Sequence, residues 1–111
     1  MTIDVATGIA RILKQENVPW VSTFPVSHVN NAFGKEGLKL LMMRDDRYAV
    51  AVADSFSRVT NGKQIGVCTF SGGINGAGAQ VAYSGIAQAY EDGSPVPVPY
   101  TPLTLPTILL V

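Results

Sequence analysis

The chain has 111 residues, of which 47% are apolar and 14% charged, a composition that suits one globular domain and excludes a disordered chain. Eight basic and eight acidic residues cancel, and no lysine or arginine stripe is present, so we expect no nucleic-acid partner. The single cysteine, Cys68, excludes an internal disulfide framework and fits a reducing cytoplasm, where we place the protein.

Neither end of the sequence carries a membrane signal. The first residues lack a basic stretch followed by an apolar run, so we expect no signal peptide. Residues 95–111 are mostly apolar, but five prolines interrupt them and forbid a spanning helix. This segment is predicted to be extended chain, and we expect no membrane partner.

Helix and strand signals alternate along the first part of the chain. Residues 5–15 carry apolar side chains at helical spacing, and Pro19 follows the end of this predicted helix. Residues 20–24 have the composition of a strand. A short helix is then expected at residues 28–33 and a second strand at residues 38–43.

The alternation continues through the second part of the chain. The expected elements are a helix at residues 46–60, a strand at residues 64–70, a helix at residues 79–90, and a fourth strand starting at Pro95 or Val96. A glycine-rich loop at residues 71–78 separates the third strand from the last helix.

The predicted strands are continuous apolar runs, which is typical of a parallel sheet covered on both faces. We therefore predict an α/β fold, a three-layer α/β/α sandwich with a mainly parallel sheet. The domain is expected to be incomplete. It occupies residues 1–94, and residues 95–111 form a proline-rich extended tail or a final strand.

Ligands of open parallel sheets bind at the carboxyl ends of the strands. Three segments fall there: residues 24–26, residues 44–47 and the loop at residues 71–78. Candidate site residues are therefore sought in these segments.

Three stretches, WVSTFP, MMRDDRYAVAVADSFSRVTNGKQIGVCTF and GAGAQVAYSGIAQAYEDGSPV, occur in an order and spacing that match a known pattern. The most specific parts are residues 53–58 and residues 85–90. Over residues 5–97 the chain resembles the N-terminal, pyrimidine-binding domain of thiamine-diphosphate-dependent enzymes, specifically the acetolactate synthase and benzoylformate decarboxylase group.

This resemblance implies a part of a lyase or carboligase that acts on small 2-oxo acids with thiamine diphosphate and Mg²⁺. In that group a separate domain bearing Gly-Asp-Gly holds the metal, and this sequence has no Gly-Asp-Gly. The implied partners are further copies of the chain in a homo-oligomer, a chain carrying the diphosphate-binding domain, or both. The chain alone is expected to be inactive.

The catalytic glutamate of the family falls on Asp46. In the family this carboxyl group hydrogen-bonds a ring nitrogen of the cofactor's pyrimidine and so promotes loss of the thiazolium C2 proton. Asp46 keeps the acid on an arm one carbon shorter. The residues alone also permit a plain role, because an aspartate before an amphipathic helix is commonly an N-cap or a first-turn acid. Asp45 fits the cap equally well.

The resemblance also places Pro25, Val26, Gly76, Ala77 and Gly78 at the cofactor. Val26 stands where the family has glycine and Ala77 where it has proline. The alignment of the loop needs about three extra residues, and another placement of the gap assigns residues 71–73 instead. An ordinary strand-to-helix turn is the alternative interpretation of this loop.

The remaining chemistry-bearing residues predict little. His28, the only histidine, is expected at the surface or at a cap, Cys68 in the core, and no metal-ligand cluster is expected. Two further hypotheses stay open: a non-catalytic interaction domain that keeps the fold, favoured by the departures at Asp46, Val26 and Val81, and an unrelated flavodoxin-like binding module.

Overall fold

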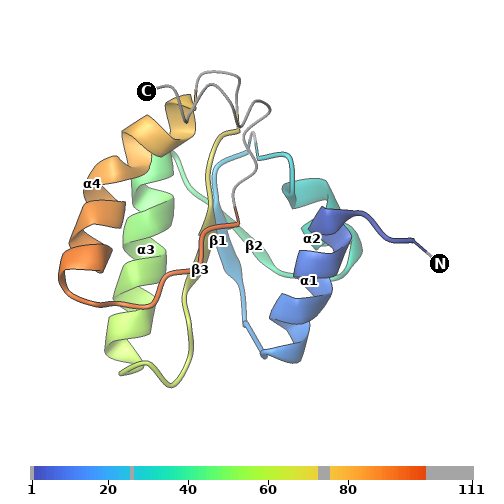
Figure 1. Cartoon of the computed structure of the whole chain (residues 1–111), viewed down its shortest axis with the longest axis horizontal. Helices are drawn as coiled ribbons and strands as arrows, with labels where there is room; N and C mark the ends of the chain where they lie inside the picture. Colours follow the sequence, from blue (N-terminus) through green and yellow to red (C-terminus); the bar gives the residue numbers. More distant parts are fainter. Residues whose placement is uncertain (1, 26, 73–75, 100–111) are drawn as a thin grey trace.

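The computed structural model describes residues 2–25, 27–72 and 76–99, which fold into three layers (Figure 1). The elements are α1 (Val5–Gln15), β1 (Val21–Thr23), α2 (Asn30–Lys35), β2 (Leu40–Met42), α3 (Asp46–Val59), β3 (Val67–Thr69) and α4 (Ala77–Glu91). The sheet stands between α1 and α2 on one side and α3 and α4 on the other (Figure 1). Within the described ranges, no helix has the length and apolarity needed to cross a membrane.

The sheet is parallel, with strand order β2-β1-β3. In register, Thr23 at the end of β1 lies beside Met42 of β2 and Thr69 of β3. β2 and β3 therefore lie on opposite sides of β1, so the chain reverses its winding direction there, which is the position where open parallel sheets bind ligands. The predicted α/β fold with a parallel sheet is confirmed.

Burial on both faces explains why the strands are apolar without alternation. β1 and β3 are fully buried along their lengths. One core cluster, between the sheet and the helices α1 and α2, centres on Leu13 and Phe33. A second cluster, under α3 and α4, contains Val50, Cys68 and Ala82.

Two helices start at other residues than expected. The helix expected at residues 28–33 begins at Asn30, because a turn in which the Asn30 N–H donates to the Ser27 carbonyl precedes it. The last helix begins at Ala77, two residues early, because Gly76 adopts a left-handed conformation with φ of 66° and turns the chain into the helix.

The fourth strand expected from Pro95 or Val96 is not formed within the described residues. The segment lies beside β3, where the Cys68 N–H donates to the Pro97 carbonyl at 3.3 Å. In a parallel ladder the next donor would be the N–H of residue 99, and Pro99 has none. One backbone hydrogen bond thus links the described part of this segment to β3, whereas a strand needs several such bonds in succession. Residues 100–111, the rest of the predicted tail, lie outside the described residues.

Two residues of the stretch 53–58 take part in an ion-pair network. Arg58 Nε lies 2.9 Å from Asp54 Oδ1, and its Nη2 lies 2.8 Å from Asp92 Oδ2, just after α4. Burial raises the pKa of the Asp54 carboxyl, but the hydrogen bond and the charge of Arg58 act the other way, and the pKa lies below the ordinary value. The network joins α3 to the end of α4.

Asp54→Asn is expected to lower the free energy of unfolding by about 1 kcal/mol at neutral pH. Because the folded pKa of Asp54 lies below its ordinary value of 3.8, its ionised form stabilises the fold above that pH. That contribution is lost as the pH falls through the folded pKa. Urea denaturation at neutral pH and in acid should therefore show the difference from the parent shrinking in acid. A deficit that is equal at both pH values would contradict this; Glu91→Gln is the control.

Gly85 lets α4 pack closely on α3. A Cβ at this position would lie 3.0 Å from both Cβ and Cγ1 of Val50, closer than side chains normally pack. Gly85→Val is therefore expected to cost about 1–3 kcal/mol of stability by overpacking. Gly34→Ala, where no atom lies within 4 Å of the new Cβ, should leave stability unchanged or raise it. Thermal unfolding of both variants checks this, and similar melting temperatures would contradict it.

Candidate functional site

The start of α3 and the loop after β3 are joined by Asp46. Its Oδ1 accepts the Ser71 backbone N–H at 2.6 Å, and the Ser71 hydroxyl lies 3.1 Å and 3.0 Å from the two carboxylate oxygens. Asp46 is only 7% exposed. A buried acid at the carboxyl end of the sheet is thus fixed in orientation by a residue 25 positions away.

The capping role belongs to the neighbouring residue. Asp45 has extended backbone geometry, and its side chain accepts the Arg47 backbone N–H at 2.8 Å, which makes it the N-cap of α3. The alternative prediction that Asp45 forms the cap is confirmed. Asp46 is the first helical residue, and its side chain turns to Ser71 instead.

The Asp46 carboxylate has acceptor capacity left. A carboxylate offers about four lone-pair positions, and Ser71 supplies two protons, one from its N–H and one from its hydroxyl. The remaining positions can accept a donor from a ligand or hold a proton shared with a ring nitrogen. This chemistry suits the polar edge of an aminopyrimidine.

The glycines of the loop after β3 are required by the protein's own backbone. A Cβ on Gly78 would collide with the carbonyl oxygen of Ser71 and lie 2.7 Å from its nitrogen. Gly76 and Gly78 are buried, whereas Ala77 is exposed. The structure therefore brings Gly78 and Asp46 together around Ser71. The predicted contacts of Gly76, Ala77 and Gly78 with a cofactor stay predictions.

The loop after β1 contacts the loop after β3 through His28. A Cβ on Gly72 would lie 2.6 Å from Cδ2 of His28, so the imidazole packs against the Gly72 backbone. Pro25 is exposed just beyond β1, and Val26 lies outside the described residues. His28 is at the surface, as predicted, but it also forms this contact between the loops.

Ser71 was predicted only under the alternative placement of the loop gap. The signal that favoured it is its position directly after a buried parallel strand, where site residues gather. His28 gave no comparable signal, because only the folded chain brings the two loops together.

The chemistry of these residues is compatible with a polar aromatic ring such as that of thiamine diphosphate. The buried acid offers a polar contact, and the half-buried Gly72 lies close to Ser71, which holds that acid. Among the residues that the structure describes, no group of three or more His, Cys, Asp and Glu side chains is placed to hold a metal ion.

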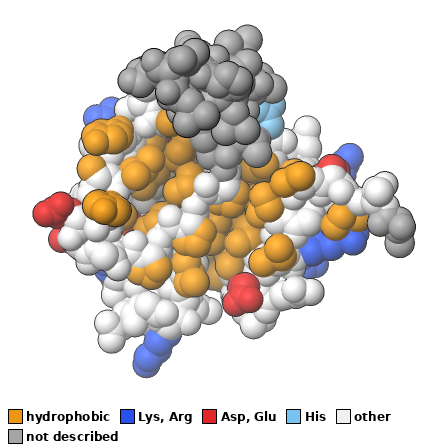
Figure 2. Space-filling view, viewed as in Figure 1, with side chains coloured by type: hydrophobic (Ala, Val, Ile, Leu, Met, Phe, Trp, Pro, Cys, Tyr) orange, Lys and Arg blue, Asp and Glu red, His pale blue; other side chains and the backbone are white. Residues whose placement is uncertain are grey.

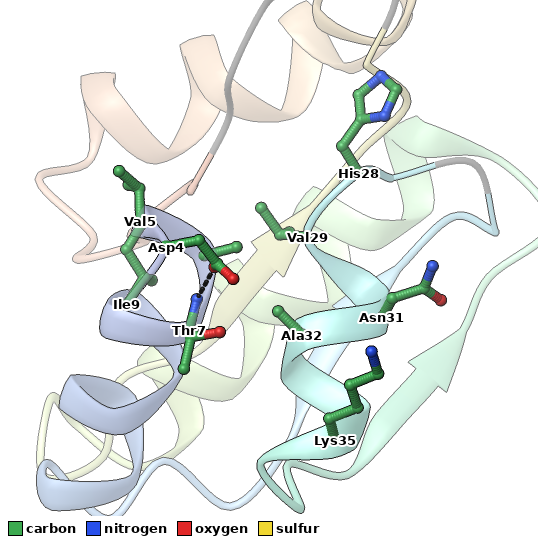
Figure 3. Close-up of a pocket in the computed structure, with 10 residues that line it drawn as sticks. Asp4, Val5, Thr7, Ile9, His28, Val29, Asn31, Ala32 and Lys35 are labelled. Atoms are coloured by element: carbon green, nitrogen blue, oxygen red, sulfur yellow. Dashed lines mark hydrogen bonds between the residues drawn. The ribbon is translucent and has the colours of Figure 1, made fainter. Parts of the chain in front are cut away.

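A cavity of about 410 Å³ lies elsewhere, between the N-terminal end of α1 and α2. Figure 3 shows His28 at one end of it and Lys35 toward the other, with Asp4 and Thr7 across from them at the N-terminal end of α1. The Asp4 carboxylate accepts the Thr7 N–H at 2.7 Å, which lowers its pKa and caps α1. Neither Asp46 nor Ser71 lines this cavity.

Comparison with known proteins identifies the family of the chain. Residues 3–98 match the family described as thiamine pyrophosphate enzyme, N-terminal TPP binding domain. The chain is 34% identical over 85 residues to the uncharacterized protein MJ0663 of Methanocaldococcus jannaschii, an alignment that covers 74% of this chain and 16% of that protein. The chain thus spans a small part of that relative's length. It belongs to the family of N-terminal TPP-binding domains of thiamine pyrophosphate enzymes.

Proposed function

We propose that this chain supplies the pyrimidine-side contacts of thiamine diphosphate in a lyase or carboligase of the acetolactate synthase and benzoylformate decarboxylase kind, acting on 2-oxo acids. The observation that carries the proposal is the buried Asp46 carboxylate, held by Ser71 at the carboxyl end of the sheet. The family match supports a component of a thiamine-diphosphate enzyme.

Each residue has a defined task in this proposal. Thiamine diphosphate, when bound, supplies the carbanion chemistry, and the protein supplies orientation and one proton contact. Asp46 holds a proton at the pyrimidine ring nitrogen, and Ser71 fixes the carboxylate in place. In this proposal Gly76, Ala77 and Gly78 lie on one side of the ring and Pro25 on the other, and a contact with Val26 stays a prediction.

Mg²⁺ and the diphosphate are assigned in this proposal to a separate domain, on a further copy of the chain or on another chain. Two tyrosines on the outer side of α4 support such an assembly: Tyr83 and Tyr90 are 70% and 85% exposed. The helix carries a single charged residue, Glu91, at its end. Figure 2 shows apolar side chains gathered on the α4 side and across the middle of this face.

A second candidate function is a non-catalytic interaction domain. The specific observation that favours it is that the short Asp46 side chain is already hydrogen-bonded to Ser71 through both oxygens. An acid retained only to tie α3 to the loop after β3 has a structural role, and the fold is then kept without the cofactor.

Asp46→Asn separates the two functions, with Asp45→Asn as a matched control. Both changes remove one negative charge, and asparagine still caps a helix at position 45. Loss of the charged acceptor at position 46 is expected to weaken binding of thiamine diphosphate with Mg²⁺ about tenfold or more. Titration calorimetry on the chain, with and without a candidate diphosphate-binding partner, measures this.

In the assembled enzyme, Asp46→Asn should also slow exchange of the cofactor's C2 proton, and Asp46→Glu should preserve or raise it. Equal affinity of Asp46→Asn and Asp45→Asn, with unchanged exchange, would make Asp46 a structural residue and favour the interaction domain.

The assembly is tested by light scattering of the chain at micromolar concentration. We expect the parent to associate, and Tyr83→Lys on α4 to reduce association because it places a charge in an apolar contact. Ser55→Lys, at an exposed position of α3, is the control and should associate like the parent. A cooperatively folding parent monomer that binds no thiamine diphosphate would contradict the proposal.

A further inference from the structure

Three buried polar side chains lie beneath the loops of the candidate site. Thr23 ends β1 and Thr69 ends β3, and both are fully buried. They are partners in the sheet register, and their hydroxyl oxygens lie 2.5 Å apart. Asn30, the first residue of α2 and 7% exposed, places its Oδ1 at 2.9 Å from Thr23 Oγ1 and 3.2 Å from Thr69 Oγ1.

The two threonine hydroxyls have two acceptors beside them. The hydroxyls carry two protons, one of which can lie between Thr23 and Thr69. Asn30 Oδ1 lies within hydrogen-bond distance of both hydroxyls, and the Phe24 carbonyl lies 3.0 Å from Thr23 Oγ1. Asn30 Oδ1 is therefore the acceptor that the two strand ends share, whereas the Phe24 carbonyl serves Thr23.

The other half of the Asn30 amide holds the loop after β1. Asn30 Nδ2 donates to the Phe24 carbonyl at 3.1 Å. The carbonyl only accepts, so the amide orientation is set: nitrogen toward Phe24 and oxygen toward the threonines. Phe24 immediately precedes Pro25. One side chain on α2 thus connects the end of β1, the end of β3 and the first residue of the loop after β1.

This connection lies at the strand ends from which the loops of the candidate site start. β1 and β3 flank the point where the sheet reverses its winding direction, and their loops separate there. The loop after β3 begins with Phe70 and Ser71, one and two residues beyond Thr69, and Ser71 holds Asp46. Asn30 therefore contacts the residue that ends each strand, just before each loop begins.

We propose that Asn30 is a positioning residue, which holds the loop containing Phe24 and Pro25 at a fixed distance from the loop containing Ser71 so that a planar ring fits between them. This inference rests on the proposed function for the identity of the ring, the aminopyrimidine of thiamine diphosphate. The coupling between the loops does not rest on it.

The coupling is tested first, in the full chain without cofactor, by amide hydrogen exchange and backbone chemical shifts. Thr69→Val removes the hydroxyl at nearly constant shape and lies on β3. It should nevertheless shift the amide signals of Phe24 and Ser27 on the other loop and speed their exchange several-fold. Thr69→Ser keeps the hydroxyl and should restore the parent behaviour.

Asn30→Ala should give the same pattern as Thr69→Val, and the two changes together should be less than additive because they break one network. Asn31→Ala is the matched control: the same residue type, one position on, exposed on the same helix. Parent-like Phe24 and Ser27 signals in Thr69→Val would overturn the coupling, even if Asn30→Ala proves too unstable to study.

The affinity for thiamine diphosphate with Mg²⁺ is then compared between the parent and Thr69→Val. A several-fold loss, with the Ser71 amide still protected by Asp46, is the expected result. If the parent binds and Thr69→Val binds equally well, the positioning role is overturned while the proposed function stands. If the parent binds no cofactor, the proposed function fails, and the positioning role for this ring fails with it, whatever the loop amides show.

Discussion

The hydrogen bond from the Ser71 backbone to the Asp46 carboxylate is the contact on which the candidate site depends. It joins the start of α3 to the loop after β3 and keeps a buried acid at the carboxyl end of the sheet. Gly78 is glycine because α4 must begin against the Ser71 backbone. Burying this acid would be costly without such a partner, so its position is determined as much by Ser71 as by α3.

The adjacent residues Asp45 and Asp46 make different contacts, and this leaves Asp46 free to bind Ser71. Asp45 satisfies the N-terminus of α3, which leaves the Asp46 side chain available for the site. Near the other end of α3, Arg58 forms an ion pair with Asp92, just after α4. The candidate site and the packing of α3 on α4 thus depend on different positions of one helix.

The α/β fold and the position of Asp46 at the strand ends could be predicted from the sequence, because apolar runs and helical spacing are local signals. The identity of the capping aspartate could not, since Asp45 and Asp46 are both suitable caps and only the backbone geometry separates them. The fourth strand was predicted from apolar content, but the missing N–H of Pro99 outweighs that content. The role of Asn30 depends on strand register and on the turn before α2, neither of which a single sequence specifies.

The position of the pyrimidine ring on the protein in solution distinguishes a site at Asp46 from a site elsewhere on the chain. Intermolecular nuclear Overhauser effects between the ring's methyl group and the chain's amides locate it without any substitution. We expect contacts to the amides of Ser71, Gly72 and Gly78. Contacts confined to the cavity between α1 and α2, at Thr7 and Lys35, would contradict it.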